Sequence, residues 1–128
     1  MEPDKSTATF EFADEFYEAY ANSILYESSS WDLKLIFGQL DQSEGEVKVV
    51  QHSAITLPWT QVKLMVYWLR GQIEAHELMN GKIHIPPPVI PPPPPPLTEE
   101  IKKSDQNAEA VYAIFHRLHK EFIASLNK

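Results

Sequence analysis

Hydrophobic and polar residues alternate along residues 22–57, which is the pattern of β-strands with one buried face. Trp31–Leu40 shows the alternation most regularly, and its apolar side consists of Trp31, Leu33, Leu35 and Phe37. Asn22–Glu27 and Glu46–Leu57 also contain aromatic or β-branched residues, although Gln51 and Ser53 interrupt the alternation in the second. Three strands are therefore predicted.

The connections between these strands are short and polar. Ser28–Ser30 and Asp41–Gly45 have the composition of turns and are too short for a crossover helix, so antiparallel pairing is expected. The face opposite Leu35 mixes apolar and polar residues, and its apolar members are expected to be Ile24, Tyr26, Ile36, Val50 and Ala54. This mixture indicates a second buried surface.

After Leu57 the hydrophobic period changes to that of a helix. Thr56 is available as a capping side chain and Pro58 is tolerated in a first turn, so a helix is predicted over Trp59–Met79. Asn80-Gly81 follows, and glycine is favoured just past a helix end. One apolar stripe is expected to lie on the sheet and a second row to widen it; these are Val62, Met65, Val66, Leu69 and Ile73, then Leu64, Trp68 and Ala75.

The predicted fold class is α+β, a small antiparallel sheet of three or four strands covered by one long α-helix, in a domain of residues 20–85. A domain of about sixty residues buries only about 60% of its unfolded surface and is marginal alone. Self-association as a dimer or higher homo-oligomer is therefore expected, through Ile24, Tyr26, Ile36, Leu64 and Trp68.

Four short motifs lie in this region: Tyr20-Ala-Asn22, Phe37-Gly38-Gln39, Leu57-Pro58 and Gln72-Ile73-Glu74-Ala-His76-Glu77. Their succession resembles a bacterial family called "domain of unknown function 3467", over about half of the chain, Tyr20 to Ile85. Leu57 and His76 depart from the family pattern, which has a serine and a tyrosine there. The resemblance implies a cytoplasmic, oligomeric strand-strand-strand-helix domain without established activity or catalytic residues.

Nine of the eleven prolines lie between Pro86 and Pro96. Such a run favours an extended polyproline II helix, which rises ~3.1 Å per residue and would here form a rod of roughly 34 Å. We interpret residues 86–96 as a spacer between the domain and the tail. The alternative is a ligand for the aromatic grooves that bind polyproline segments.

Residues 97–128 are predicted to form a separate amphipathic helix, with Thr98 or Ser104 as its cap. Apolar residues recur every three or four positions across Ala108–Leu126, and such a helix must pack on another surface to be stable. We expect a neighbouring subunit, another tail helix or a separate protein to bind its stripe of Val111, Phe115, Leu118, Phe122 and Leu126.

Residues 1–19 are predicted to be a flexible arm with acidic and aromatic side chains. Met1–Thr9 is polar, and a short helix over Asp14–Tyr20 would place Phe16 and Tyr20 on one face. We interpret these aromatic residues as a cap on the protein's own core or on a neighbouring subunit. A docking motif for another protein is the alternative.

Composition narrows the class of protein further. The chain has 128 residues, 43% of them hydrophobic, no cysteine and a formal net charge of -7. This charge argues against nucleic acid, because phosphate binding requires clustered Lys and Arg. Residues 97–128 carry five acids and five bases, which does not suit an anionic membrane, and no export or membrane-spanning pattern is present. The lack of cysteine fits a cytoplasmic location.

No side-chain cluster predicts a catalytic site, a cofactor or a metal. His116 and His119 have a spacing that can chelate, but Tyr112 and Ile123 occupy the positions where a third ligand would help. We interpret the two histidines as a solvated pair. Acidic pairs, such as Glu74 with Glu77, are likewise assigned to solvated faces.

The function that the sequence favours is a non-catalytic interaction or assembly protein. It self-associates through its sheet-helix domain and presents the C-terminal helix to a protein partner. One alternative is a peptide-binding chaperone similar to the SecB export chaperones, on fold analogy alone. A metal-dependent or acid-base enzyme is the third and least favoured class.

Overall fold

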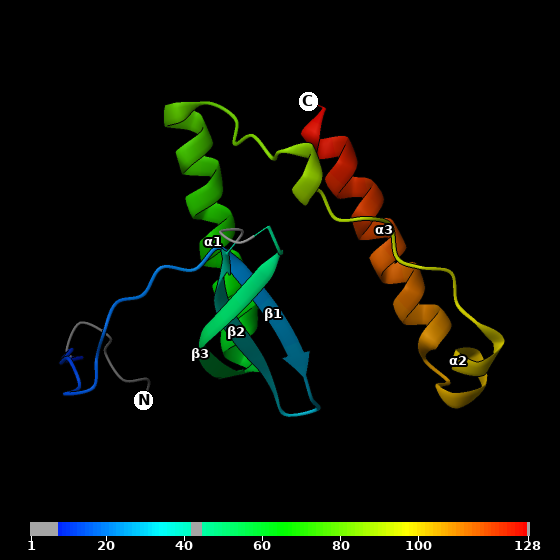
Figure 1. Ribbon diagram of the computed structural model, residues 1–128, viewed down its shortest axis with the longest axis horizontal. Coiled ribbons are helices and arrows are strands. Elements are labelled where there is room, and N and C mark those ends of the chain that lie inside the picture. The colour runs from blue at the N-terminus through cyan, green and yellow to red at the C-terminus, as the bar shows by residue number, and fades with distance from the viewer. Residues whose placement is uncertain (1–7, 42–44, 128) are drawn as a thin grey trace, which may run out of the picture. The chain divides into compact units, whose positions relative to one another are not determined.

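The computed structural model describes residues 8–41 and 45–127 (Figure 1). Their elements are β1 (Ser23–Ser28), β2 (Asp32–Asp41), β3 (Lys48–Pro58), α1 (Trp59–Asn80), the 3-10 turn η2 (Pro87–Val89), α2 (Glu99–Ser104) and α3 (Ala108–Leu126). The chain forms two compact units that divide within α1, between Glu74 and Ala75. We call them the sheet unit and the tail unit.

The sheet unit contains a three-stranded antiparallel sheet in the order β1-β2-β3, followed by the long helix α1. The predicted α+β class is confirmed. The polar turn between β1 and β2 is held by Ser29, whose Oγ accepts hydrogen bonds from the backbone N–H groups of Trp31 and Asp32, both at 3.1 Å. The turn predicted over Asp41–Gly45 lies partly outside the described residues.

The pairing register defines the two faces of the sheet, because directly paired residues in antiparallel strands share a side. Tyr26 pairs with Leu35, which pairs on its other side with Ile55. We call this side the Leu35 face; its apolar members are Ile24, Tyr26, Leu33, Leu35, Phe37, Val50, Ile55 and Leu57. The opposite Ile36 face has Leu25, Ile36, Leu40, Val49 and Ala54.

Two sequence-based face assignments are therefore wrong. Ile24 and Tyr26 do not share a face with Ile36, because the register of the β1-β2 hairpin places them opposite Phe37 and Leu35. A one-residue change of register inverts every side chain of a strand, and the sequence pattern does not fix that register.

Val50 is also on the Leu35 face, because a β-bulge inverts the phase within β3. Phe37 pairs with Ser53 whereas Gly38 pairs with Gln51, so His52 is the extra residue. The bulge places Gln51 on the Ile36 face, whereas Ser53 pairs with Phe37 and remains a polar residue on the Leu35 face.

Gly38 lies at the bulge, where the backbone of β3 approaches closely. A Cβ atom at Gly38 would lie 2.8 Å from the carbonyl oxygen of Val50, whereas one at Gly71 in α1 would have nothing within 4 Å. We expect Gly38→Ala to lower the free energy of unfolding by about 1–3 kcal/mol. Gly71→Ala, the control, should raise it by up to about 1 kcal/mol. Urea unfolding followed by circular dichroism checks both, and equal midpoints would contradict the close approach.

α1 begins directly after β3, so the predicted cap is wrong: Thr56 and Pro58 are still strand residues, paired with Lys34 and Asp32. The first helical residue is tied to the β1-β2 turn, since Trp59 Nε1 donates to the carbonyl oxygen of Ser29 at 2.9 Å. The predicted helix is otherwise confirmed to within one residue. Its glycine stop is confirmed too, because Gly81 has a φ of 89°.

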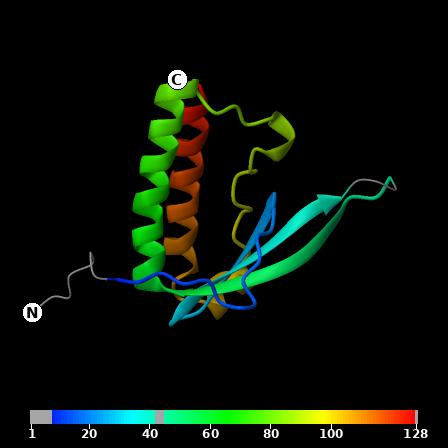
Figure 2. The ribbon, with the colours of Figure 1, turned by 90° about the vertical axis from the view of Figure 1, so that its left-hand side faces the viewer.

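α1 covers little of the sheet. It rises from one end of the sheet (Figure 2), and none of its residues is buried. Of the predicted stripe only Val62 and Met65 are half-buried, whereas Val66, Leu69 and Ile73 remain about half exposed. The expected contact of this stripe with the sheet is therefore confined to its start.

In the tail unit, residues 86–96 do not form one straight rod. Val89 and Ile90 have the only N–H groups in this stretch, and both donate within η2, to Pro86 and Pro87. The break in the proline run is thus where the chain turns. Beyond the turn the chain lies along α3, where Pro91 O is 3.0 Å from His119 Nε2.

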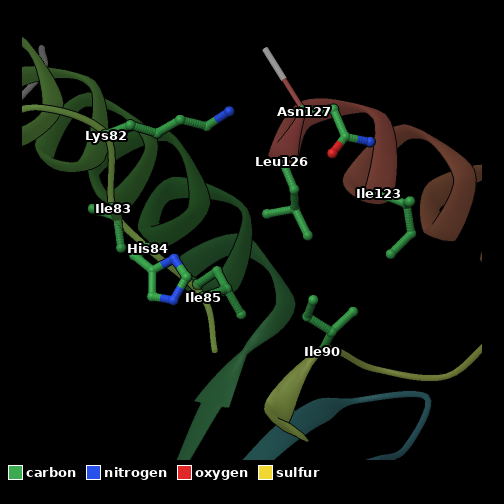
Figure 3. A pocket seen from close by; sticks show the side chains of 8 residues that line it. All are labelled: Lys82, Ile83, His84, Ile85, Ile90, Ile123, Leu126 and Asn127. Atoms are coloured by element: carbon green, nitrogen blue, oxygen red, sulfur yellow. The ribbon is translucent and has the colours of Figure 1, made fainter. Parts of the chain in front are cut away.

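This path makes the tail unit a hairpin. Lys82 Nζ, before the prolines, donates to the carbonyl oxygen of Ser125 near the end of α3 at 2.7 Å. Figure 3 shows Ile123 and Leu126 facing Ile85 and Ile90 across a pocket. The prolines therefore do not separate α3 from Lys82 and Ile85, which come just before them.

The predicted C-terminal helix is two helices. Thr98 caps α2 by accepting from the N–H of Ile101 at 3.2 Å, as expected. The chain then breaks at Asp105, whose backbone is extended and whose Oδ1 accepts from the N–H of Asn107 at 2.9 Å. α3 therefore starts at Ala108, and Ser104 does not cap it.

The described part of the arm, residues 8–19, contains no helix, and neither do residues 20–22 that follow it. Over Asp14–Tyr20 the structure has a single turn, closed by a bond from Phe16 N–H to the carbonyl oxygen of Ala13 at 3.0 Å. A first helical turn is costly to form, and Phe16 and Tyr20 gain no burial here that would offset the cost. The short helix predicted there is wrong, and residues 1–7 lie outside the described part.

Candidate protein interaction surfaces

The hydrophobic core of the described residues is very small. Leu35 and Ala108, each 6% exposed, are the only buried hydrophobic residues in the described ranges. Large apolar side chains on the sheet, on α1 and on α3 are exposed at the same time. Large contiguous apolar surfaces of this kind mark interaction sites. The candidate site is therefore a set of surfaces for protein contact.

The first surface is the Leu35 face with the arm that borders it. His52 Nε2, at the bulge, lies 2.9 Å from the carbonyl oxygen of Tyr20. The arm thus lies beside the sheet and encloses a hollow of about 400 Å³, lined by Tyr17, Ala19, Ala21, Phe37, His52, Ser53, Ala54 and Ile55. Phe16 and Tyr20 nevertheless remain 54% and 70% exposed, so the interpretation of the arm's aromatic residues as a cap stays a prediction.

The second surface is a groove along α1. Val66, Leu69 and Ile73 line it, and Arg70 and Glu74 border it with an ion pair of 3.4 Å. The groove measures about 510 Å³. Leu64 and Trp68 lie on the other side of the helix, because at 3.6 residues per turn they are out of phase with this stripe.

The third surface is on α3, beside the prolines. One row of α3 residues, Ala108, Tyr112, His116, His119, Ile123 and Leu126, is buried or half-buried within the tail unit. The neighbouring row of Val111, Phe115, Leu118 and Phe122 remains exposed. Phe115, Leu118, His119 and Phe122 form a groove of about 370 Å³ with Pro91, Pro92 and Pro94.

The partner-binding stripe predicted for α3 is thus divided by the structure. Val111, Phe115, Leu118 and Phe122 lie together on the exposed row, but Leu126 is half-buried against Ile85 and Ile90. The sequence analysis missed the row that contacts the prolines because His116 and His119 made it look polar. Its helical spacing from Ala108 to Leu126 was the available signal.

The residues predicted for self-association do not form one surface. Ile24 and Tyr26 lie on the Leu35 face, Ile36 on the opposite face, and Leu64 and Trp68 on α1. All except the half-buried Ile36 are exposed, with Trp68 at 65%. They are available for contact, but to more than one neighbouring surface.

The polar candidates have structural contacts. His119 binds the proline segment and is half-buried with His116, so the pair is less solvated than expected. Glu77 accepts a hydrogen bond from the N–H of Ile83 at 2.8 Å, and Glu74 pairs with Arg70. Within residues 8–41 and 45–127, no three His, Asp or Glu side chains gather as a metal site would require. In the same ranges no helix has the length and apolar character needed to span a membrane.

Comparison of the chain with protein-family models, with curated proteins and with solved structures finds no match. The resemblance to the bacterial family therefore stays a prediction. The function has to be argued from the surfaces themselves.

Proposed function

We propose that this protein is a non-catalytic assembly subunit, which self-associates through its sheet unit and presents α3 to a protein partner. The observation that carries the proposal is the small core, in which Leu35 is the one buried hydrophobic residue among the described residues of the sheet unit. A sheet and a helix with so little mutual burial require another apolar surface. A second copy of the chain supplies an apolar surface of the same kind.

The energies involved favour association. Burying one large apolar side chain completely contributes about 1.5–3 kcal/mol, and the net stability of a folded domain is only about 5–15 kcal/mol. Ile24, Tyr26, Val66 and Leu69 are all at least 43% exposed. Covering several such side chains would therefore change the free energy of unfolding by an amount comparable to the entire net stability of a domain.

Light scattering of the purified full chain at micromolar concentration tests self-association. We expect a mass at least twice that of one chain. A monomer under these conditions would remove the basis of the proposal.

The partner surface on α3 is tested by Phe115→Asp. Phe115 is 57% exposed beside the prolines, and losing its burial in a complex should weaken binding about ten- to a hundredfold. Lys120→Asp, on an exposed position of the same helix, is the control. Tagged chains are used as bait in extracts of the native organism. Proteins that the natural chain captures should be lost with Phe115→Asp and retained with Lys120→Asp. Recovery of the same proteins with both variants would exclude this surface.

A second candidate function is a peptide-binding chaperone, favoured by the open apolar groove between the prolines and Phe115, Leu118 and Phe122. A chaperone of this kind should slow the aggregation of an unrelated unfolded protein. An assembly subunit should not do so. Aggregation of a reduced model protein, followed by turbidity with and without the chain, separates the two functions.

A further inference from the structure

α1 follows β3 without a connecting residue, since β3 ends at Pro58 and α1 begins at Trp59. Helices that fold back over a sheet commonly follow a loop of about two to six residues. Without such a loop, α1 rises from the end of its own sheet (Figure 2). The groove lined by Val66, Leu69 and Ile73 consequently has no sheet of its own chain against it.

The Leu35 face is the complementary surface that this groove lacks. Ile24, Tyr26, Val50 and Ile55 on this face are between 43% and 65% exposed. The only charged residues on the strands of this face are Asp41 and Lys48, which pair in register at its far end.

The Ile36 face is less suitable for an apolar helix. It carries Glu27 and Lys34, which form an ion pair of 3.6 Å with both side chains largely in solvent. Covering this face with a helix would remove the water from that pair, which is costly.

We propose that two copies of the chain exchange α1, so that the Val66, Leu69 and Ile73 groove of each packs on the Leu35 face of the other. The inference rests on the proposed self-association and names its interface. Among the described residues of the sheet unit, Val66, Leu69 and Ile73 of the groove are 49–58% exposed, and the outer side chains of the Leu35 face, Ile24, Tyr26, Val50 and Ile55, are 43–65% exposed around the buried Leu35. A two-fold symmetric exchange covers both in each copy and leaves no further copy to be recruited.

The available surface suits a stable dimer. Tyr26, 65% exposed, offers roughly 100–160 Å² of its side chain, given about 150–250 Å² for a whole aromatic residue. Each copy contributes seven half-exposed large side chains: Ile24, Tyr26, Val50 and Ile55 from the sheet, and Val66, Leu69 and Ile73 from α1. Together they approach the ~800 Å² that each partner buries in a standard interface.

Cross-linking between two differently tagged full-length chains tests the exchange, because the natural chain has no cysteine. Chains with Ile55→Cys and chains with Leu69→Cys are unfolded, mixed, refolded and treated with a short bis-maleimide. With one cysteine per chain, every mixed product joins two copies. We expect the mixed pair of Ile55→Cys and Leu69→Cys to be the main product, at least fivefold above the controls.

Two controls define the surfaces. Leu25→Cys replaces Ile55→Cys on the Ile36 face at nearly equal exposure, and Leu64→Cys replaces Leu69→Cys on the side of α1 away from the groove, again at nearly equal exposure. Equal or greater linking with either control overturns the exchange. If Ile55→Cys disturbs the far-ultraviolet circular dichroism spectrum, Val50→Cys takes its place. A multimer by light scattering without the expected cross-link leaves the proposed function standing and refutes the exchange, whereas a monomer refutes both.

Discussion

Leu35→Asp is expected to unfold the sheet unit and to abolish self-association. Leu35 is at the centre of β2, paired with Tyr26 and Ile55, and is 6% exposed. An unpaired carboxylate at this position loses its water, which costs several kcal/mol. That amount is comparable to the entire stability of a small domain, about 5–15 kcal/mol. Circular dichroism should show loss of strand signal, and light scattering should show loss of the multimer.

Leu25→Asp is the matched control, because it makes the same change on the neighbouring strand but on the Ile36 face. Leu25 is 51% exposed, so the new carboxylate keeps most of its water and the expected loss is below about 1 kcal/mol. Equal damage from the two variants would show that the two faces are buried alike. That result would contradict the conclusion that Leu35 is the tightly packed apolar residue of the sheet unit.

The sequence predicted the elements of the sheet unit well because each has a strong local signal. The alternation over Trp31–Leu40 and the glycine at position 81 both depend on neighbouring residues alone. The faces were less predictable. The bulge at His52 and the register of Ile24 against Phe37 arise from pairing between strands, and no periodicity within one strand contains that information.

The residues that precede α1 were assigned wrongly for a related reason, although the helix does begin at Trp59. Thr56 and Pro58 fit a helix start locally, but pairing with β2 keeps both residues in the strand. This competition removes the loop before the helix and leaves the groove of α1 open. The candidate interaction surface thus results from a contact between strands, which sequence spacing did not disclose.

The proline segment shows how tertiary contacts change the role of a recognisable stretch. Composition predicted a straight rod. Residues within and around the proline run determine the path that the segment takes instead. Val89 and Ile90 interrupt the run and form η2, and His119 holds Pro91. Of the apolar row of α3 chosen from the sequence, Val111, Phe115, Leu118 and Phe122 are exposed, whereas Leu126 is half-buried.

Ile123→Lys is expected to open the tail hairpin. Ile123 is half-buried and lines a cavity of about 390 Å³ with Ile85, Ile90 and Leu126, and Lys82 already lines the same cavity. A second ammonium group beside Lys82 adds like-charge repulsion to a loss of about 1–2 kcal/mol of apolar burial. Helices of about this length are marginal when unsupported, so the amides of α3 should exchange hydrogen at least about tenfold faster.

The matched control is Ile114→Lys, the same substitution on the same helix at a side chain that is 46% exposed and outside that cavity. Hydrogen exchange followed by mass spectrometry measures α3 and also the peptide with Val89 and Ile90, whose two N–H groups report on η2. Both regions should lose protection together in Ile123→Lys and keep it in Ile114→Lys. If α3 loses protection while Val89 and Ile90 keep theirs, the proline segment is ordered without the helix, and the hairpin is not a cooperative unit.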